Sequence, residues 1–108
     1  MKKLKKRKPT FCVYMLRLTN GNLYTGHTRD LQARCLQHAR GRGGRYTRSF
    51  PPVGVAQCWN TYGTRAAAMR VEALIKSCTR RQKERLIAEP ALLETLLRRR
   101  SGSRMRLE

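Results

Sequence analysis

The sequence predicts an α+β fold in which helices flank a small three-stranded antiparallel sheet. Two strand-like segments, residues 10–18 and 23–27, are separated by Asn20-Gly21, which is typical of a tight hairpin because glycine accepts positive φ. A third strand-like segment follows at residues 53–60. Helical patterns surround it, so the order is strand, strand, helix, strand and then helices. A chain that begins with a hairpin and continues mainly with helices favours an antiparallel sheet covered by helices.

The first strand segment is apolar on both faces, which predicts that both faces are covered. One face carries Phe11, Val13 and Met15, and the other carries Cys12, Tyr14, Leu16 and Leu18. In the return strand, Tyr24 and Gly26 should point to the same side. Gly54 weakens the third strand pattern.

The first helix is expected from about residue 28 to residue 40. Thr28 is its expected cap, Asp30 lies in its first turn, and Gly41 ends it. Arg34 and His38 are four residues apart, so they share a face that borders the apolar stripe. That position suits side chains at the edge of a cleft.

The second half of the chain predicts three more helices. Thr64 begins one that runs to about Ser77, with Glu72 beside its apolar stripe and four residues from Lys76. Thr79 and Gln82 have the spacing of a capping box for the segment RRQKERLIA. A last short helix is expected at ALLETLL.

The composition points to a polyanionic partner. The 108 residues include 25 basic and 6 acidic ones, and the net charge is +19. Residues 1–8 hold six of the basic residues and residues 98–106 hold five, but the middle also keeps a large excess. Such a charge favours nucleic acid, with affinity that falls steeply with salt. We expect a basic disordered arm at 1–9, a domain at 10–97 and a basic tail at 98–108.

Other classes find little support in the sequence. No run approaches the roughly 18 apolar residues of a membrane span, and the basic start lacks the apolar region of a secretory signal. The four cysteines form no CxxC pair, which predicts reduced thiols and a cytoplasmic protein, nucleoid-associated if bacterial. Residues 41–52 are predicted as a glycine-rich basic loop. The expected nucleic-acid contacts are Arg42, Arg45 and Arg48 of this loop, together with Lys76.

Five residues could together cleave a phosphodiester bond. They are Tyr14, Tyr24, Arg34, His38 and Glu72. Mg²⁺ takes one or two carboxylates, and Glu72 is the candidate by elimination. Arg34 suits a phosphate oxygen, the phenols could serve as base or relay, and His38 is a competing general base. Taken singly, each also has a purely structural interpretation.

The motifs resemble the GIY-YIG nuclease domain over roughly residues 10–88. Cys12-Val13-Tyr14 is followed, ten residues after Tyr14, by Tyr24-Thr25-Gly26. The continuation that is similar to the family's helices is Thr28, Asp30, Arg34, His38, Ala68, Glu72 and Lys76. With RRQKERLI, the likeness is to small stand-alone members. Cys12 replaces the first glycine of the family name, and Thr25 replaces its second isoleucine.

The resemblance implies a nuclease that depends on Mg²⁺ or Mn²⁺ and acts on DNA rather than RNA, in repair or recombination. Tyr14 or His38 would help to activate water, Arg34 would steady the phosphate, Tyr24 would position the scissile group, and Glu72 would hold the metal. No further DNA-binding domain is expected, so specificity would come from the tails, the loop or a protein partner. The alternatives are a non-catalytic DNA- or RNA-binding protein on the same fold and a structural RNA-associated protein.

Overall fold

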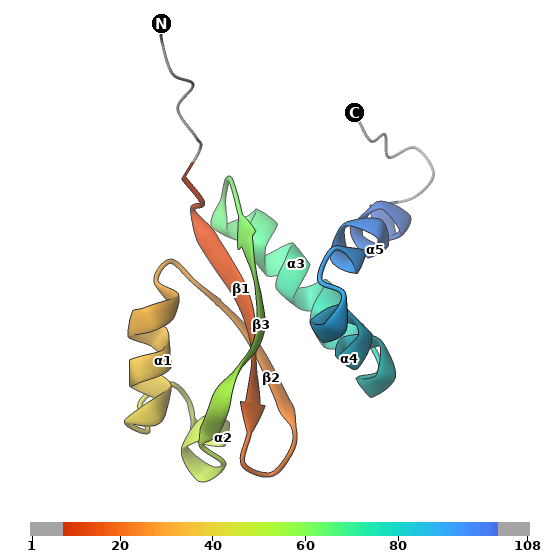
Figure 1. Cartoon of the computed structure of the whole chain (residues 1–108). Helices are drawn as coiled ribbons and strands as arrows, with labels where there is room; N and C mark the ends of the chain where they lie inside the picture. The colour runs from red at the N-terminus through yellow and green to blue at the C-terminus, as the bar shows by residue number, and fades with distance from the viewer. Residues whose placement is uncertain (1–7, 102–108) are drawn as a thin grey trace, which may run out of the picture.

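A computed structural model describes residues 8–101 and shows a three-stranded sheet with helices on both of its faces (Figure 1). The elements in chain order are β1 (Phe11–Leu18), β2 (Leu23–Thr28), α1 (Leu31–Ala39), α2 (Arg45–Ser49), β3 (Pro52–Thr61), α3 (Arg65–Ser77), α4 (Arg80–Ala88) and α5 (Leu92–Ser101). The α+β prediction is confirmed.

The sheet has the order β2-β1-β3, and both pairings are antiparallel. The turn between β1 and β2 forms where Asn20-Gly21 predicts it. Gly21 has a φ of 86°, and its amide donates to the Leu18 carbonyl at 2.8 Å. Because β1 is the middle strand, β2 lies at an edge of the sheet. Side chains from both faces of the sheet can therefore reach β2.

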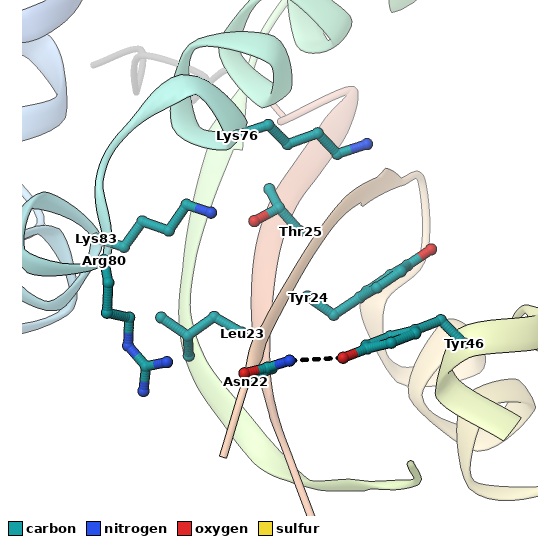
Figure 2. Close-up of a pocket in the computed structure, with 8 residues that line it drawn as sticks. All are labelled: Asn22, Leu23, Tyr24, Thr25, Tyr46, Lys76, Arg80 and Lys83. Carbon is teal, nitrogen blue, oxygen red and sulfur yellow. Dashed lines mark hydrogen bonds between the residues drawn. The ribbon is translucent and has the colours of Figure 1, made fainter. Parts of the chain in front are cut away.

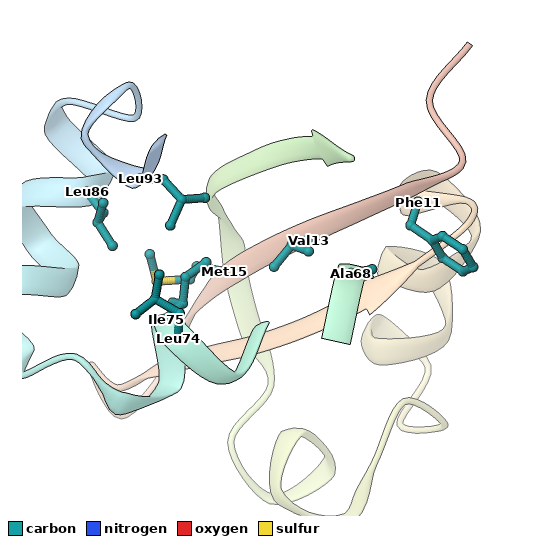
Figure 3. Packing of buried hydrophobic residues seen from close by; sticks show 8 residues of the cluster. All are labelled: Phe11, Val13, Met15, Ala68, Leu74, Ile75, Leu86 and Leu93. Atoms are coloured by element: carbon teal, nitrogen blue, oxygen red, sulfur yellow. The ribbon is translucent and has the colours of Figure 1, made fainter. Parts of the chain in front are cut away.

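Strand β1 is buried on both faces, as its sequence predicts. Phe11, Val13 and Met15 pack in a core with α3, α4 and α5 (Figure 3). Its even-numbered residues form a second core that includes Tyr24, Leu31 and Cys35. In Figure 1, α1 and α2 accordingly lie on one side of the sheet and α3 to α5 on the other.

The pairing of β1 with β3 is irregular at two places. The register shifts between Met15 and Leu16 and again between Arg17 and Leu18. Gly54 lies in the strand between these shifts, opposite Arg17, so the weak strand pattern around it coincides with bulged pairing.

Hydrogen-bonding caps start most of the long helices. The Thr64 hydroxyl accepts from the amide of Ala67, and Thr79 with Gln82 completes the predicted capping box. The predicted cap of α1 was wrong. Asp30 is the cap, and its carboxylate accepts from the amide of Ala33 at 3.0 Å. Thr28 instead binds the amide of Asp30, because β2 extends through Thr28 and the chain turns only afterwards.

Two boundaries differ from the sequence prediction. Residues 41–52 are not a continuous loop, because RYTRS forms the helix α2 and Pro52 already begins β3. Helix α5 continues through Arg98–Ser101, where the basic tail was expected to begin, since arginine is a good helix former. Most of the predicted arm and the residues after 101 lie outside the described range. Within that range, no helix has the length and apolar character of a membrane span.

Candidate active site

Tyr14 lies in the middle of the central strand, and its phenol crosses toward the edge strand. It pairs with Gly26 in the β1–β2 register, and Tyr24 pairs with Leu16 two positions along. The two phenols therefore project from adjacent strands on the same face, as the alternation predicts. A Cβ on residue 26 would lie 2.6 Å from the Tyr14 hydroxyl oxygen, so the glycine leaves the space that this ring occupies.

His38 is buried behind Tyr14 and does not lie at the edge of a cleft as predicted. Only 1% of its surface is exposed. Its Nδ1 lies 2.9 Å from the Thr47 hydroxyl, and its Nε2 lies 3.1 Å from the Tyr14 hydroxyl. Helix α2 supplies Thr47 and closes over the imidazole, which explains a burial that the periodicity of α1 could not indicate.

The hydrogen bonds of Thr47 define the tautomer of His38. The Thr47 hydroxyl donates to the Gly44 carbonyl, so its oxygen accepts from Nδ1–H of His38. Nε2 then carries no proton and accepts the phenol proton of Tyr14. The bond joins a phenol donor to an imidazole acceptor, and the raised pKa of Tyr14 with the lowered pKa of His38 keeps the proton on the phenol.

The pKa shifts of this pair show which other charges lie near it. Burial and then the neighbouring phenol of Tyr24 raise the pKa of Tyr14, the Arg34 guanidinium opposes this, and the Glu72 carboxylate adds to it. Burial and then Arg34 lower the pKa of His38. Arg34 thus acts on both members of the pair, and Tyr24 and Glu72 act on Tyr14, although the five predicted residues come from four elements.

Glu72 approaches the edge strand from the opposite face of the sheet, on α3. Its side chain is 16% exposed, and its two oxygens accept from His27 Nδ1 at 2.5 Å and from Lys76 Nζ at 2.7 Å. Burial raises the pKa of this carboxyl, but the bonds from Lys76 and His27 outweigh that effect and leave the pKa below its ordinary value. The predicted pair of Glu72 and Lys76 is present.

His27 is a site residue that the sequence reasoning missed. Arg65 donates to its Nε2 at 3.2 Å, so its Nδ1–H is the group that donates to Glu72. A signal for it existed in the sequence. Alternation along β2 places residue 27 on the face opposite Tyr24, and this is the face that α3 covers.

The remaining acidic side chains in the described part of the chain are committed elsewhere. Asp30 caps α1, and Glu84 accepts from both Arg17 and Arg80. Glu89, at the end of α4, pairs with Arg85, and Glu94 pairs with Arg98 within α5. Glu72 is also paired, with His27 and Lys76, but unlike the others it lies against β2. A metal-binding role for Glu72 stays a prediction.

The donor set around Glu72 fits a water-rich Mg²⁺ site held by one carboxylate. Each Glu72 oxygen keeps a second lone pair beside its present donor. Mg²⁺ commonly binds through one or two carboxylates, several waters and substrate phosphates. Among the described residues, no three His, Cys, Asp or Glu side chains come together as a metal cage. A Mg²⁺ ion held here would therefore take its remaining ligands from water and substrate.

The predicted nucleic-acid contacts lie on exposed positions. Arg42 precedes α2, and Arg45 and Arg48 belong to that helix. Their neighbour Tyr46 lines a pocket at the edge of the sheet together with Tyr24 and Lys76. Of residues 41–52, Tyr46 is the one that lines this pocket, and the three arginines are exposed without lining it.

Fold and site together define a small α+β domain with phenol, guanidinium, imidazole and carboxylate groups gathered around one edge strand. The family model for the GIY-YIG catalytic domain matches residues 10–85, and the chain belongs to this nuclease family.

Individual relatives carry the name UPF0213. The UPF0213 protein of Staphylococcus epidermidis is 39% identical over 77 residues, which cover 71% of this chain and 93% of the relative. That of Serratia proteamaculans is 40% identical over 85 residues, 78% of this chain and 81% of the relative. The solution NMR structure of a UPF0213 protein from Bacillus halodurans is 35% identical, covers 79% of this chain and 93% of that one, and superposes with a TM-score of 0.46.

Proposed function

We propose that the protein is a metal-dependent endonuclease that hydrolyses phosphodiester bonds in DNA. The observation that carries the proposal is the convergence at β2. The ion pair of Glu72 with Lys76 reaches this edge strand from α3, and Lys76 lines one pocket with Tyr24. The charge of Arg34 acts on the hydrogen-bonded pair of Tyr14 and His38.

Each group has a role that its position supports. Arg34 binds a non-bridging phosphate oxygen, for which its planar, permanently charged fork is suited. Tyr24 lines the pocket and is the phenol that contacts the scissile group. Tyr14 donates a hydrogen bond to Nε2 of His38, which makes His38 a positioning partner of Tyr14 rather than an independent base.

Glu72 is the residue that holds the metal ion in this proposal. Bound Mg²⁺ or Mn²⁺ supplies a Lewis acid that stabilises charge on the phosphate and lowers the pKa of a bound water. His27 and Lys76 orient the carboxylate, and Lys76 limits the negative charge at the site until a cation arrives. We place the protein with cellular DNA, in repair or recombination, and in the nucleoid if it is bacterial.

The test is cleavage of labelled single-stranded, duplex, flap and branched DNA at low salt, with Mg²⁺, Mn²⁺ or EDTA. We expect cutting that requires the metal and falls at least about 100-fold in Glu72→Gln, which removes one charge without changing the size of the side chain. Glu94→Gln is the matched control, because Glu94 pairs with Arg98 on the surface of α5.

The alternative is a protein that binds nucleic acid without cutting it. The net charge of +19 supports binding with or without catalysis. If pure protein bound these substrates tightly but cut none of them with either metal, the nuclease proposal would be wrong and the binding function would stand. The same panel made of RNA shows which nucleic acid is preferred.

A further inference from the structure

We propose that the pocket beside β2 is a binding subsite for a phosphate group of the nucleic-acid substrate, next to the position of the scissile phosphate. The pocket has a volume of about 430 Å³ and lies between the start of β2 and helices α2, α3 and α4 (Figure 2). Its lining is Asn22, Leu23, Tyr24, Thr25, Tyr46, Lys76, Arg80 and Lys83. The inference rests on the proposed function, because it assigns a second contact to the same substrate.

The charge of the lining is entirely positive. Three of the lining residues are basic, and none is acidic. Arg80 is held by Glu84 and by the Gly21 carbonyl, and Lys76 is held by Glu72. Within residues 8–101, the ammonium group of Lys83 forms no ion pair and no hydrogen bond, so its charge is available to a ligand.

A buried hydroxyl in the same lining also lacks a partner. Thr25 is only 4% exposed, and its Oγ1 forms no hydrogen bond within the described chain. Figure 2 shows this hydroxyl and the ammonium group of Lys83 directed toward one another across the pocket. A buried hydroxyl is normally satisfied, so a phosphate oxygen reached by both groups would complete an otherwise missing bond.

The opposite wall consists of polar groups that are already positioned. The amide groups of Asn20 and Asn22 donate to the Tyr46 hydroxyl at 3.0 and 2.6 Å, which fixes α2 against the hairpin. Tyr24 lies between this wall and Lys76 (Figure 2). In this proposal, a nucleic-acid strand that presents its scissile phosphate to Tyr24 places a neighbouring phosphate within the pocket.

The bound phosphate could be an internal phosphodiester of a nucleic-acid strand or a phosphate at the end of that strand. Both offer the same anionic oxygens to Lys83 and Thr25, so binding alone does not separate them. Oligonucleotides of one sequence, with and without a terminal 5′-phosphate, distinguish the two sources. If replacing Lys83 weakens binding of the oligonucleotide without a terminal phosphate, the pocket binds an internal phosphodiester. If it weakens binding only of the 5′-phosphorylated oligonucleotide, the pocket binds the strand end.

The experiment measures binding of these oligonucleotides by fluorescence anisotropy, with Glu72→Gln present in every protein so that no substrate is cut. We expect Lys83→Ala to weaken binding on the order of ten-fold, as for loss of a charged hydrogen bond. It should also reduce the slope of log affinity against log salt by about 0.7–0.9, which corresponds to one phosphate contact. Thr25→Val, which keeps the shape of the side chain, should weaken binding without lowering stability.

Arg81→Ala is the matched control, because Arg81 is an exposed cation of the same helix that does not line the pocket. If Lys83→Ala bound as tightly as Arg81→Ala and with the same salt slope, the subsite would be wrong, even if Glu72-dependent cleavage were established. If the protein cut nothing but the Lys83 effect were present, the nuclease proposal would fail and the phosphate site would stand.

Discussion

At the scale of single residues, the buried pair of Tyr14 and His38 dominates the site. Two glycines make room for it. Gly26 leaves space for the phenol, and Gly43 packs so closely on the imidazole that a side chain there could not be accommodated without movement. The pair also explains why Tyr24-Thr25-Gly26 ends in glycine, since Gly26 pairs directly with Tyr14 across the two strands.

Gly26→Ala should therefore destabilise the fold. The added methyl group would lie 2.6 Å from the Tyr14 hydroxyl oxygen and 2.9 Å from the carbon that bears it. Overpacking of this kind costs about 1–3 kcal/mol, measured as the free energy of unfolding in urea. Gly54→Ala is the control, because nothing lies within 4 Å of a Cβ at that strand position. Equal stability of the two variants would show that the Tyr14 ring is not held as described.

The burial of His38 predicts a pH dependence of stability. Its pKa is lowered in the folded state, chiefly by burial and then by Arg34, so between the folded and unfolded pKa values the unfolded chain binds more protons. The contribution of His38 to stability is thus complete above the ordinary histidine pKa of about 6.5 and is lost as the pH falls toward the folded pKa.

Urea unfolding at several pH values between 5 and 8 measures this effect. We expect the free energy of unfolding to decrease from pH 7.5 to pH 5 and expect a flatter profile in His38→Gln, whatever the absolute stability of that variant. Parallel profiles for the two proteins would contradict the assignment. The lowered pKa of Glu84, about 2, acts in a more acidic range and does not interfere.

At the scale of elements, the edge strand β2 joins the two halves of the site. Its residues alternate between the side of α1 and α2 and the side of α3, so Tyr24 and His27 serve opposite faces. Helix α4 is tied to the hairpin by a two-pronged ion pair between Arg17 and Glu84, with distances of 3.1 and 3.0 Å, and by the bond from Arg80 to the Gly21 carbonyl. These contacts hold the basic start of α4 beside the pocket.

Thr79→Ala should weaken the start of α4. The Thr79 hydroxyl accepts from the Gln82 amide at 3.1 Å, and the Gln82 side chain accepts from the Thr79 amide at 2.8 Å. Loss of such a cap costs about 1 kcal/mol of unfolding free energy. Thr19→Ala, an exposed turn position, should change stability by less than about 0.5 kcal/mol. An unchanged free energy of unfolding in Thr79→Ala would mean that the capping box contributes nothing to stability.

At the scale of the whole molecule, a strongly cationic domain has a single carboxylate, that of Glu72, at its candidate site. The six acidic residues stand against 25 basic ones, and those in the described chain other than Glu72 cap a helix or pair with arginine. In the proposed function, this charge attracts a polyanion to a surface on which a divalent cation would have one protein anchor. This distribution suits a substrate whose own phosphates complete the metal site.

The salt dependence of DNA binding should report this surface. Seven cations flank the site or its neighbouring loop: Arg34, Arg42, Arg45, Arg48, Lys76, Arg80 and Lys83. A strand in contact with all seven would give a slope of log affinity against log salt of about −5 for single-stranded and about −6 for duplex DNA. Anisotropy titrations of Glu72→Gln between 50 and 200 mM salt measure it. A slope near −1 would place the DNA elsewhere.

Much of the fold can be predicted from the chain because local signals agree with the tertiary structure. The hairpin at Gly21, the two apolar faces of β1 and the caps at Thr64 and Thr79 depend on neighbours in the sequence, and each was found. The short helix α2 was missed, since its position depends on a contact with another helix, between Thr47 and His38. The cap of α1 was misplaced by two residues, because β2 extends further than its pattern indicated.

By itself, the sequence determined the fold class, the charge and the set of groups from which a phosphodiesterase site could be made, because composition and short-range spacing specify these. Only the tertiary structure decided how the groups are used. It buries His38 behind Tyr14, joins Glu72 to His27 across 45 positions of the chain and places Lys83 opposite the unpaired hydroxyl of Thr25. These relations arise from the packing of α2, α3 and α4 around an edge strand, and no periodicity within one segment encodes such long-range packing.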